Sequence, residues 1–409
     1  YSSAASDVYK RQIALLSLNI VEQAASVITG TIPGMAKTFS NVSLVNIELV
    51  TTVVSVFVTV FVLVSGFVVK KIGQKQTAVL GLAIASVSSI IPAVSNNFTV
   101  ILISRAVLGI GIGLANPLAI SLIGVFFFGD ERAKLMGWRS AIAGVGTSLM
   151  TYFAGQLLNI SWHAAYWVYL LFVPTLLLFI FFVPDPEKSG AVERQEIEQE
   201  KELQVAKEKG KKHRKDSKGL IASLAMLTFL ILIAIMVFAI KLPTYFVDNK
   251  IGTATQASTA WSIYNFASVV GGILFGYCYK ILRKFILPLG LILSGIGMVL
   301  VSWVKSVDII YMLCVVMGIV GAMIIPYIFN RISEISSPKK APLYTSIALV
   351  GSNLGSFLSP YAGKILGNSG NLAIMNSGLL LVVLSIVTLI VIININSNRT
   401  TKNSIQNGE

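Results

Sequence analysis

Long apolar runs alternate with short polar segments along the whole chain. Twelve runs are long enough for a helix across a hydrocarbon layer of about 30 Å, which takes about 20 residues. Barrel strands would be shorter and would alternate apolar with polar positions, which these runs do not. We therefore predict an all-α membrane protein with transmembrane helices at 13–36, 44–69, 76–94, 98–127, 138–159, 164–183, 219–247, 255–280, 285–304, 308–331, 342–366 and 371–394.

The last six predicted helices repeat features of the first six. Four helix pairs carry matching residues at nearly one offset, which is hard to obtain by chance. The two halves therefore read as parallel copies of a six-helix unit. The matching residues are Pro33 and Pro243, Gly66 and Gly276, Pro117 and Pro326, and Ala154-Gly155 with Ala362-Gly363.

The repeat divides the chain into two bundles, 13–183 and 219–394. Residues 184–218 between them are charged, acidic first and basic at the end, and we expect a solvated cytoplasmic linker rather than a regulatory partner site. Residues 1–12 are polar and begin without Met, so we interpret them as a non-native segment outside the fold. Residues 395–409 are predicted to form a polar cytoplasmic tail.

Composition excludes an ordinary water-soluble enzyme. Hydrophobic residues make up 55% of the 409 positions and charged residues only 12%, with a mean hydropathy of +0.79. Soluble domains carry about 25% charged residues. The net charge of +14 does not indicate nucleic acid, because the cations lie between apolar runs instead of on a polar domain.

The distribution of cations predicts the orientation. Of the 32 Lys and Arg, all but six fall in the segments that share one side with both termini. Lys and Arg near span ends are retained in the cytoplasm. We therefore expect an integral protein of a bacterial cytoplasmic membrane with both termini inside. The exceptions are Lys37, Lys250, Lys305 and Lys364 on the other side, and Arg105 and Lys241 within spans.

The fourth predicted helix contains Arg105-Ala-Val-Leu-Gly109-Ile-Gly111. Together with twelve helices in two six-helix repeats and a charged central segment, this R-x-x-x-G-x-G pattern resembles the major facilitator superfamily of secondary transporters. The resemblance covers the chain after residue 12. It implies two pseudo-symmetric bundles whose first, fourth, seventh and tenth helices line a central cavity.

The loop between the second and third helices is also similar to a signature of that family, and the resemblance implies a role in gating. The family pattern places an acidic residue where this chain has Lys70, so the acid that helps to lock the cytoplasmic gate is missing from its usual place. The corresponding loop residues here are Gly66, Lys70, Lys71, Gly73 and Lys75.

Two ionisable residues lie deep within predicted spans. Glu22 is about 15 Å into the first helix at 1.5 Å per residue, and Arg105 enters the fourth helix to a comparable depth. Charges at that depth are costly unless they face a cavity or a partner. If the two helices adjoin, Glu22 takes up and releases a proton while Arg105 tunes its protonation, or one of the two residues binds a charged substrate. The alternative is a fixed interhelical pair that sets packing.

Further polar and aromatic side chains are candidates for the cavity wall. In the first helix they recur every three or four residues around Glu22, which places them on one face. Lys241, towards the outer end of the seventh helix, is expected to extend to the membrane interface, with capture of an anionic substrate as the alternative. The candidates are Asn19, Gln23, Ser26, the Ala115-Asn116 step, Lys241, Tyr245, Trp261, Tyr264, Asn265, Tyr327 and Asn330.

We interpret the chain as a secondary transporter of a small organic solute that works by alternating access. It is expected to be a monomer in the lipid bilayer, coupled to protons, and to export a drug or metabolite. Uptake of an organic anion, coupled or facilitated, is the alternative. A non-transporting receptor or scaffold is a different class. No P-loop or metal-spaced cluster occurs, so we expect no enzyme, cofactor or metal site.

Overall fold

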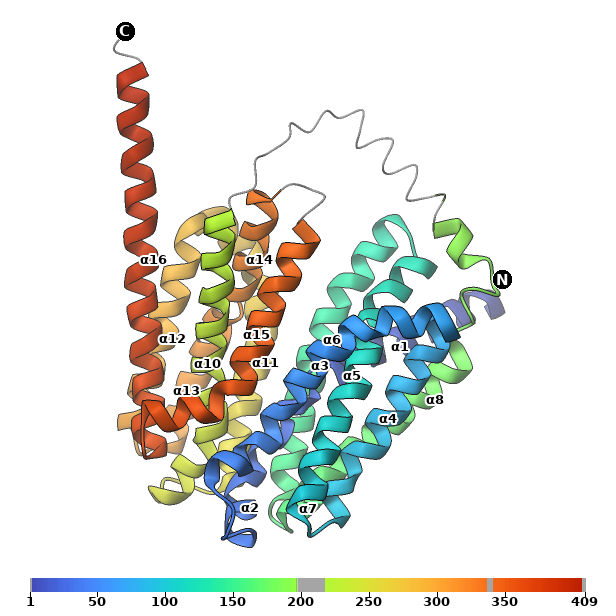
Figure 1. Cartoon of the computed structure of the whole chain (residues 1–409), viewed down its shortest axis with the longest axis horizontal. Helices are drawn as coiled ribbons and strands as arrows, with labels where there is room; N and C mark the ends of the chain where they lie inside the picture. The colour runs from blue at the N-terminus through green and yellow to red at the C-terminus, as the bar shows by residue number, and fades with distance from the viewer. Residues whose placement is uncertain (1, 196, 198–217, 337–340, 407–409) are drawn as a thin grey trace.

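The computed structural model describes residues 2–195, 197, 218–336 and 341–406, and these fold into helices without a β-strand. The helices form two bundles that stand side by side, one from each half of the chain (Figure 1). The described residues on either side of the central linker lie at the upper end of this view. The last helix, α16, also extends past its bundle at this end. The predicted all-α class is confirmed.

The N-terminal half contains six helical segments at the positions of the predicted spans, and the first of them is bent. The first span consists of α1, η1 and α2, with a bend of 46° between Ser6–Val21 and Ala24–Thr38. The sixth consists of α7, η2 and α8. The elements are α1 (Ser2–Glu22), η1 (Ala24–Thr31), α2 (Ile32–Thr38), α3 (Leu44–Ile72), α4 (Gln74–Val94), α5 (Phe98–Phe126), α6 (Gly129–Leu157), α7 (Trp162–Ala165), η2 (Tyr166–Leu171) and α8 (Phe172–Phe182).

The C-terminal half repeats this succession, and α13 with α14 makes up its fourth span. The last helix continues to Gln406, so the segment predicted as a tail begins as a helical extension. The elements are α10 (Lys218–Asp248), α11 (Ala254–Leu282), η3 (Arg283–Phe285), α12 (Ile286–Trp303), α13 (Val307–Gly321), α14 (Ile324–Ile335), α15 (Ala341–Leu366) and α16 (Gly370–Gln406).

Small polar residues at the polar breaks start several of these helices. Ser43 accepts a hydrogen bond from the Asn46 amide and Asn97 accepts one from the Val100 amide. Thr253 and Gln256 form a reciprocal capping box at the start of α11. Such caps satisfy amides that the first turn of a helix leaves without partners. The breaks between apolar runs therefore fix the helix ends chemically as well as by hydropathy.

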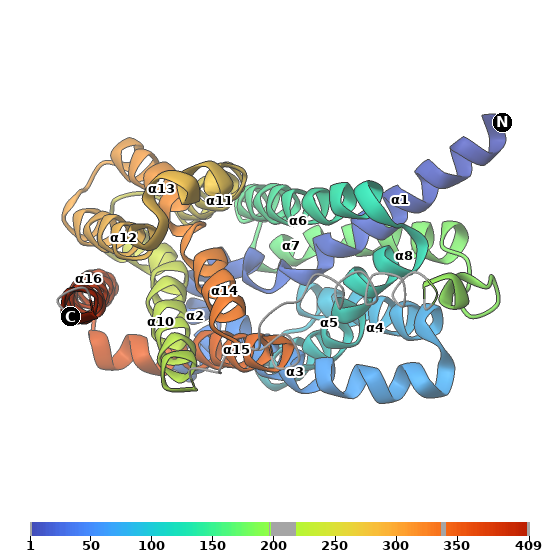
Figure 2. The same ribbon diagram turned by 90° about the horizontal axis from the view of Figure 1, so that it is seen from above.

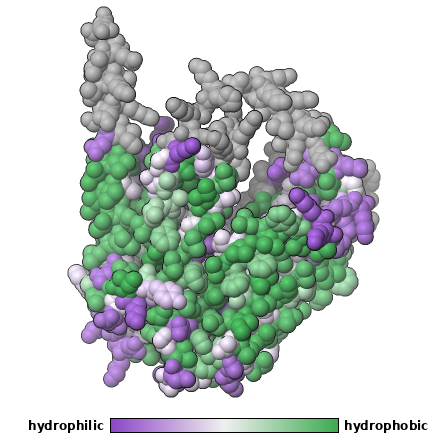
Figure 3. Space-filling view, viewed as in Figure 1, coloured by the Kyte–Doolittle hydropathy of each residue, from purple (hydrophilic) through white to green (hydrophobic). Residues whose placement is uncertain are grey.

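The described helices agree with the predicted spans, with two of them less apolar than the rest. By length and composition, eight described helical segments can cross a membrane, or nine with the bent first span. One segment, Ala254–Trp303, covers two predicted spans. The remaining predictions, 138–159 and 342–366, correspond to α6 and α15, which contact α11 and α3 of the opposite half. Figure 3 shows the apolar belt that these helices present on one face.

Each half has its own hydrophobic core. One core joins buried residues from Ala14 to Val183, with Ile240 as its single contribution from the other half. A second core joins residues from Leu224 to Leu381. Since the two cores are separate, the contacts between the halves form a distinct surface, along which α3 meets α15 and α6 meets α11 (Figure 2).

Candidate transport cavity and gate

A cavity of about 860 Å³ lies between the two halves, towards the linker end of the bundle. Its N-terminal wall comes from α6 and includes Trp138 and Ser140, and Gln23 from the first span joins them. Its C-terminal wall comes from α11 with Ser268 and Phe275. Ligand sites combine apolar walls with a few polar groups in this way. Lys134 and Arg139 add positive charge to the lining.

Beyond this cavity the two halves are joined by direct hydrogen bonds. Ser148 of α6 and Ser262 of α11 each donate a hydroxyl proton to the backbone carbonyl of the other, at 2.8 and 2.7 Å. Thr52 of α3 donates to the Phe357 carbonyl of α15 at 3.3 Å. These residues lie in the half of each helix that is far from the linker. The cavity is therefore closed at that end.

A buried ion pair also crosses between the halves at the closed end. The Lys241 ammonium of α10 lies 2.6 Å from a Glu48 carboxylate oxygen of α3. The Glu48 side chain is fully buried and that of Lys241 is 6% exposed. Gly363 of α15 leaves the space that the Lys241 stem occupies, since a Cβ there would lie 3.1 Å from Lys241 Cε.

Polar groups without partners surround this pair. The second carboxylate oxygen of Glu48 is buried, and within the described residues it has no hydrogen-bond partner. The same holds for the hydroxyls of Thr51, one turn after Glu48, and Thr244, one turn after Lys241. Buried polar groups in proteins are nearly always hydrogen-bonded, so exceptions in one place call for an explanation. Here they cluster around the charged contact between the halves.

The position of Lys241 corrects one expectation and reveals a residue that sequence analysis missed. Lys241 does not extend to the interface, because an opposite charge on the other half holds its ammonium in the interior. Glu48 was not among the candidates. The signal was nevertheless present, since Glu48 is an acid a few residues inside the predicted span 44–69, and such residues are rare in spans without a function.

Arg105 is buried and bound entirely within the N-terminal half. Its guanidinium donates to the Val50 carbonyl at 2.9 Å, to the Ala25 carbonyl at 2.8 Å and to the Tyr169 hydroxyl at 3.2 Å. Tyr169 in turn donates to the Ala24 carbonyl at 2.7 Å. Ala24 and Ala25 lie where the first span changes from an α-helix to a 3-10 helix. Arg105 and Tyr169 therefore stabilise that break.

This geometry favours the packing role for Arg105. Its three described hydrogen bonds end on protein groups, and the side chain has no exposed surface. The predicted approach to Glu22 stays a prediction, because the Glu22 side chain is outside the described part of the structure. The Arg105 contact with Ala25 does show that the fourth span reaches the first span just beyond Glu22.

Seven of the remaining candidates fall into three groups. Gln23 lines the cavity, and Ser26 is partly exposed on the following turn. Asn19 and Tyr245 are buried and bond to carbonyls, Asn19 within its own helix and Tyr245 to Val301 of α12 at 2.9 Å. Buried in the C-terminal core, Trp261 and Tyr264 stack at 4.8 Å, and Asn265 donates to the Trp261 carbonyl.

Tyr327, Asn330 and the adjacent residues Ala115 and Asn116 lie away from this cavity. Asn330 of α14 donates to the Tyr279 hydroxyl and to Glu334, which itself pairs with Arg331 at 2.9 Å. Tyr327 is nearly buried one turn before, at a separate groove of the C-terminal half. Ala115 is buried against Gly81 of α4, where the two helices pack closely.

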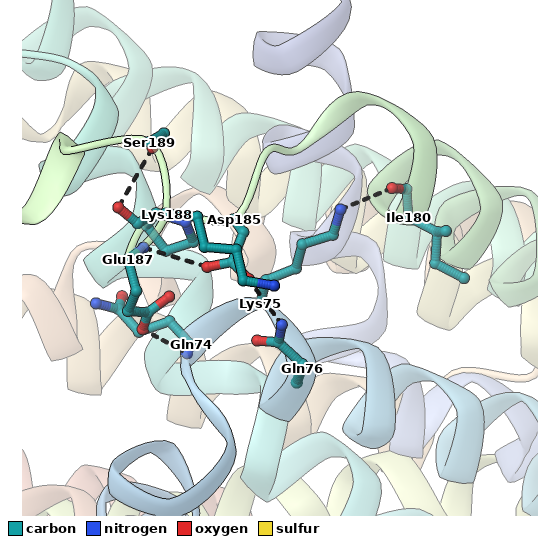
Figure 4. Close-up of polar contacts among 9 residues, drawn as sticks. Gln74, Lys75, Gln76, Ile180, Asp185, Glu187, Lys188 and Ser189 are labelled. Carbon is teal, nitrogen blue, oxygen red and sulfur yellow. Dashed lines mark hydrogen bonds and ion pairs between the residues drawn. The ribbon is translucent and has the colours of Figure 1, made fainter.

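The predicted gating loop contacts the start of the linker (Figure 4). The Gln74 amide at the start of α4 donates to the Glu187 carboxylate at 2.8 Å, and the Gln76 side chain donates to Asp185 at 2.8 Å. Lys75 donates to the Ile180 carbonyl at 2.9 Å. We call these contacts the loop clasp. Gly73 turns the chain with φ of +89°, a conformation that other residues rarely adopt.

The loop clasp brings two carboxylates, Asp185 and Glu187, to a loop that itself has Lys70 where the family pattern has an acid. Glu187 occupies the N-terminus of α4, where the helix dipole favours an anion. The hydrogen bond from Gln76 lowers the pKa of Asp185 below its ordinary value, since the bond stabilises the charged form. Lys70 and Lys71 are exposed on the preceding turn. The first residues of the predicted linker thus belong structurally to the N-terminal half.

Two helical bundles, each with its own core, enclose a cavity that is open towards one membrane face and closed towards the other. That arrangement defines the class of polytopic membrane proteins built from two helical bundles. The sequence matches the Major Facilitator Superfamily over residues 14–245 and 224–407, and the chain belongs to this family. Among described residues, no group of three or more His, Cys, Asp or Glu could hold a metal ion.

Characterised relatives align with part of the chain. Multidrug transporter protein MdtP of Bacillus subtilis (strain 168) is 28% identical over 178 residues, 42% of this chain and 32% of that protein. Quinolone resistance protein NorA of Staphylococcus aureus is 30% identical over 134 residues, 32% of this chain and 34% of that protein. The chain thus spans about a third of the length of these curated relatives.

Solved structures of the same fold align over nearly the whole chain. The inward open conformation of the xylose transporter XylE from E. coli has a TM-score of 0.72 with 15% identity, covering 94% of this chain and 95% of that one. A POT family transporter in complex with a thioalcohol-conjugated peptide has a TM-score of 0.72 with 11% identity, covering 93% and 95%. At these identities the likeness shows a shared fold and nothing more specific.

Proposed function

We propose that this protein exports a small amphipathic compound in exchange for protons by alternating access. The observation that carries the proposal is the Glu48–Lys241 ion pair, because it joins the two halves at the closed end of the cavity. A contact that must break when the halves separate is a natural point at which ion binding controls movement.

Protonation of Glu48 would change the strength of this contact. A neutral carboxyl no longer attracts Lys241, and removing one partner of a buried pair costs about 3–5 kcal/mol. The cost falls only on the closed arrangement, since separated halves expose both side chains to water. A protonated Glu48 would therefore favour the other arrangement, and a deprotonated Glu48 would favour the one described.

The proposed direction of transport and substrate class depend on which cations already have protein partners and on the lining of the cavity. Uptake of an organic anion through Arg105 and Lys241 requires both cations, and both are already bound by protein groups. The cavity offers Trp138 and Phe275 with several small polar groups, which suits an amphipathic compound. Lys134, a cation of its lining, favours a neutral or negatively charged amphiphile over a cation.

The relatives named above support export. Their names describe a multidrug transporter and a resistance protein. We propose the same orientation as the cation distribution predicts: a bacterial cytoplasmic membrane, both termini inside, and a cavity open to the cytoplasm. The proposed unit is a monomer, since each described half contributes one wall of one cavity. Labelling of single cysteines near residue 195 and at Asn249 from either side tests the orientation.

The test is flux in proteoliposomes of the full chain, with ethidium, a neutral dye and a carboxylated dye as probes. A pH gradient is expected to drive movement of at least one dye, the neutral or carboxylated one before ethidium. Glu48→Gln is expected to keep expression and dye binding but to remove the effect of the gradient. Glu193→Gln, an exposed linker carboxylate, is the matched control and is expected to leave coupling unchanged.

Other outcomes redirect or refute the proposal. Gradient-driven flux that survives in Glu48→Gln but disappears in Glu22→Gln moves the proton site to Glu22, as the sequence predicted. Flux of the carboxylated dye in the direction of uptake supports the organic-anion alternative. Specific binding of dyes without any flux, with or without a gradient, contradicts transport and supports a receptor or scaffold.

A further inference from the structure

A groove of about 1020 Å³ opens in the C-terminal half, at the end where the linker rejoins α10. It lies outside the cavity between the halves and is lined by α10, α16 and the turn between α11 and α12. Aliphatic side chains form its length, including Leu227 of α10 and Val387 and Val391 of α16. At the upper limit of ordinary ligand sites, about 300–1,000 Å³, the groove has room for a long apolar chain.

Positive charge lies at one end of this groove. Arg283 and Lys284 line it at the turn after α11, and Phe285 follows them with 44% of its surface exposed. Within the described residues, neither Arg283 nor Lys284 forms an ion pair with a carboxylate. Arg331, the third cation of the lining, is paired with Glu334. In the part of the chain that the structure describes, these two cations of the groove therefore have no carboxylate partner.

The backbone at this turn is held in an unusual conformation. Arg283 has φ of +46° and ψ of −116°, which an L-residue with a long side chain rarely adopts. Such outliers persist only where the surroundings fix them, and they are frequent at functional sites. The conformation places the Arg283 and Lys284 side chains between the end of α11 and the start of α12, beside the apolar groove.

We propose that this groove binds one phospholipid with an anionic headgroup. The headgroup phosphate lies on Arg283 and Lys284, and one acyl chain lies along Leu227, Val387 and Val391. Basic pockets between transmembrane helices on the cytoplasmic side favour such lipids, and cations attract the anionic inner leaflet. The cation distribution predicts that the groove faces this leaflet. A soluble phosphate would use the cations alone and leave the apolar length of the groove unfilled.

The test is native mass spectrometry of the full chain in detergent with equal amounts of phosphatidylglycerol and phosphatidylcholine. The wild-type chain is expected to retain one phosphatidylglycerol in preference to phosphatidylcholine. Arg283→Gln/Lys284→Gln is expected to lower that preference about thirtyfold, as two cations near a lipid surface imply. Lys70→Gln/Lys71→Gln removes the same charge from exposed positions at the same membrane end, and is expected to keep the preference.

A second variant tests the apolar part separately. Ala222 is an exposed residue of the groove wall, and Ala222→Trp is expected to fill the groove and to abolish retention while both cations remain. Millimolar inorganic phosphate is expected not to displace the lipid. An unchanged preference in Arg283→Gln/Lys284→Gln, an equal loss in Lys70→Gln/Lys71→Gln, or full retention in Ala222→Trp would each overturn the proposal. Size-exclusion profiles identify any variant that fails to fold.

Discussion

Lys241 and Glu48 belong to different halves of the protein, and their charged atoms lie 2.6 Å apart in an interior that water barely reaches. A pair of this kind stabilises little compared with well-packed apolar residues, because desolvation offsets most of the attraction. Removing only one of its two charges is costly, because the other charge stays buried without a partner. The two halves can separate, by contrast, when both side chains become exposed to water together.

The first prediction concerns the stability of this pair. Lys241→Met leaves the Glu48 carboxylate buried without a counterion, and we expect the free energy of unfolding to fall by about 3–5 kcal/mol. The double variant Glu48→Gln/Lys241→Met is expected to recover most of that loss. Thermal unfolding in detergent, evaluated as a double-mutant cycle, measures the coupling. Additive losses in the cycle would show that the two side chains do not interact.

The second prediction concerns the broken first span. Arg105→Lys keeps the charge, but a single ammonium cannot match the fork that reaches Val50, Ala25 and Tyr169 together. Loss of two hydrogen bonds from a charged donor is expected to lower stability by about 3–6 kcal/mol. Tyr169→Phe, which removes one hydroxyl, is expected to cost less. If Arg105→Lys has the same free energy of unfolding as the wild type, the guanidinium does not stabilise the break in the first span.

The third prediction compares two glycines that differ in how closely other atoms approach them. A Cβ on Gly111 would lie 2.6 Å from the Gly81 carbonyl oxygen, so Gly111→Ala must push α4 and α5 apart and is expected to lower the melting temperature. A Cβ on Gly66 would meet no atom within 4 Å. Gly66→Ala is expected to raise stability by about 0.5–1 kcal/mol through helix propensity. A matching loss in both variants would contradict close packing as the reason for Gly111.

The fourth prediction concerns the loop clasp and pH. The pKa of Asp185 is lowered by the Gln76 hydrogen bond, so the clasp is complete above the unfolded pKa of about 3.9 and is lost as pH falls through the lower folded value. Spin labels at Lys71→Cys and Ser189→Cys are expected to keep one distance from pH 7 to pH 5 and to separate in stronger acid. Asp185→Asn is expected to separate them already at pH 7. Separation near pH 6 in the unaltered clasp would point to a different titrating group.

Much of the fold was predictable because the bilayer imposes a simple rule on sequence. Every predicted span has a helical counterpart, and the breaks lie where caps such as Ser43 and Thr253 occur. The bend between Val21 and Ala24 was not predictable. Its own residues do not enforce a break, and the groups that stabilise it, Arg105 and Tyr169, come from the fourth and sixth spans.

The candidate site was predicted less well than the fold. A single sequence locates a costly charge in depth but does not show which side chain it meets. Lys241 and Arg105 were both recognised as unusual, yet one meets an acid in the opposite half and the other meets backbone carbonyls of its own half. Glu48 was overlooked because it lies near the end of a span, where depth alone indicates a small cost.

The bend in the first span divides that span between two mechanical partners. Below it, α1 packs on α5, α6 and α8 of its own bundle, whereas η1 and α2 beyond it also contact α10 of the other bundle. An unbroken rod would transmit any tilt from one membrane face to the other. A bend held by Arg105 instead leaves η1 and α2 able to move with α10, while α1 stays packed in its own bundle.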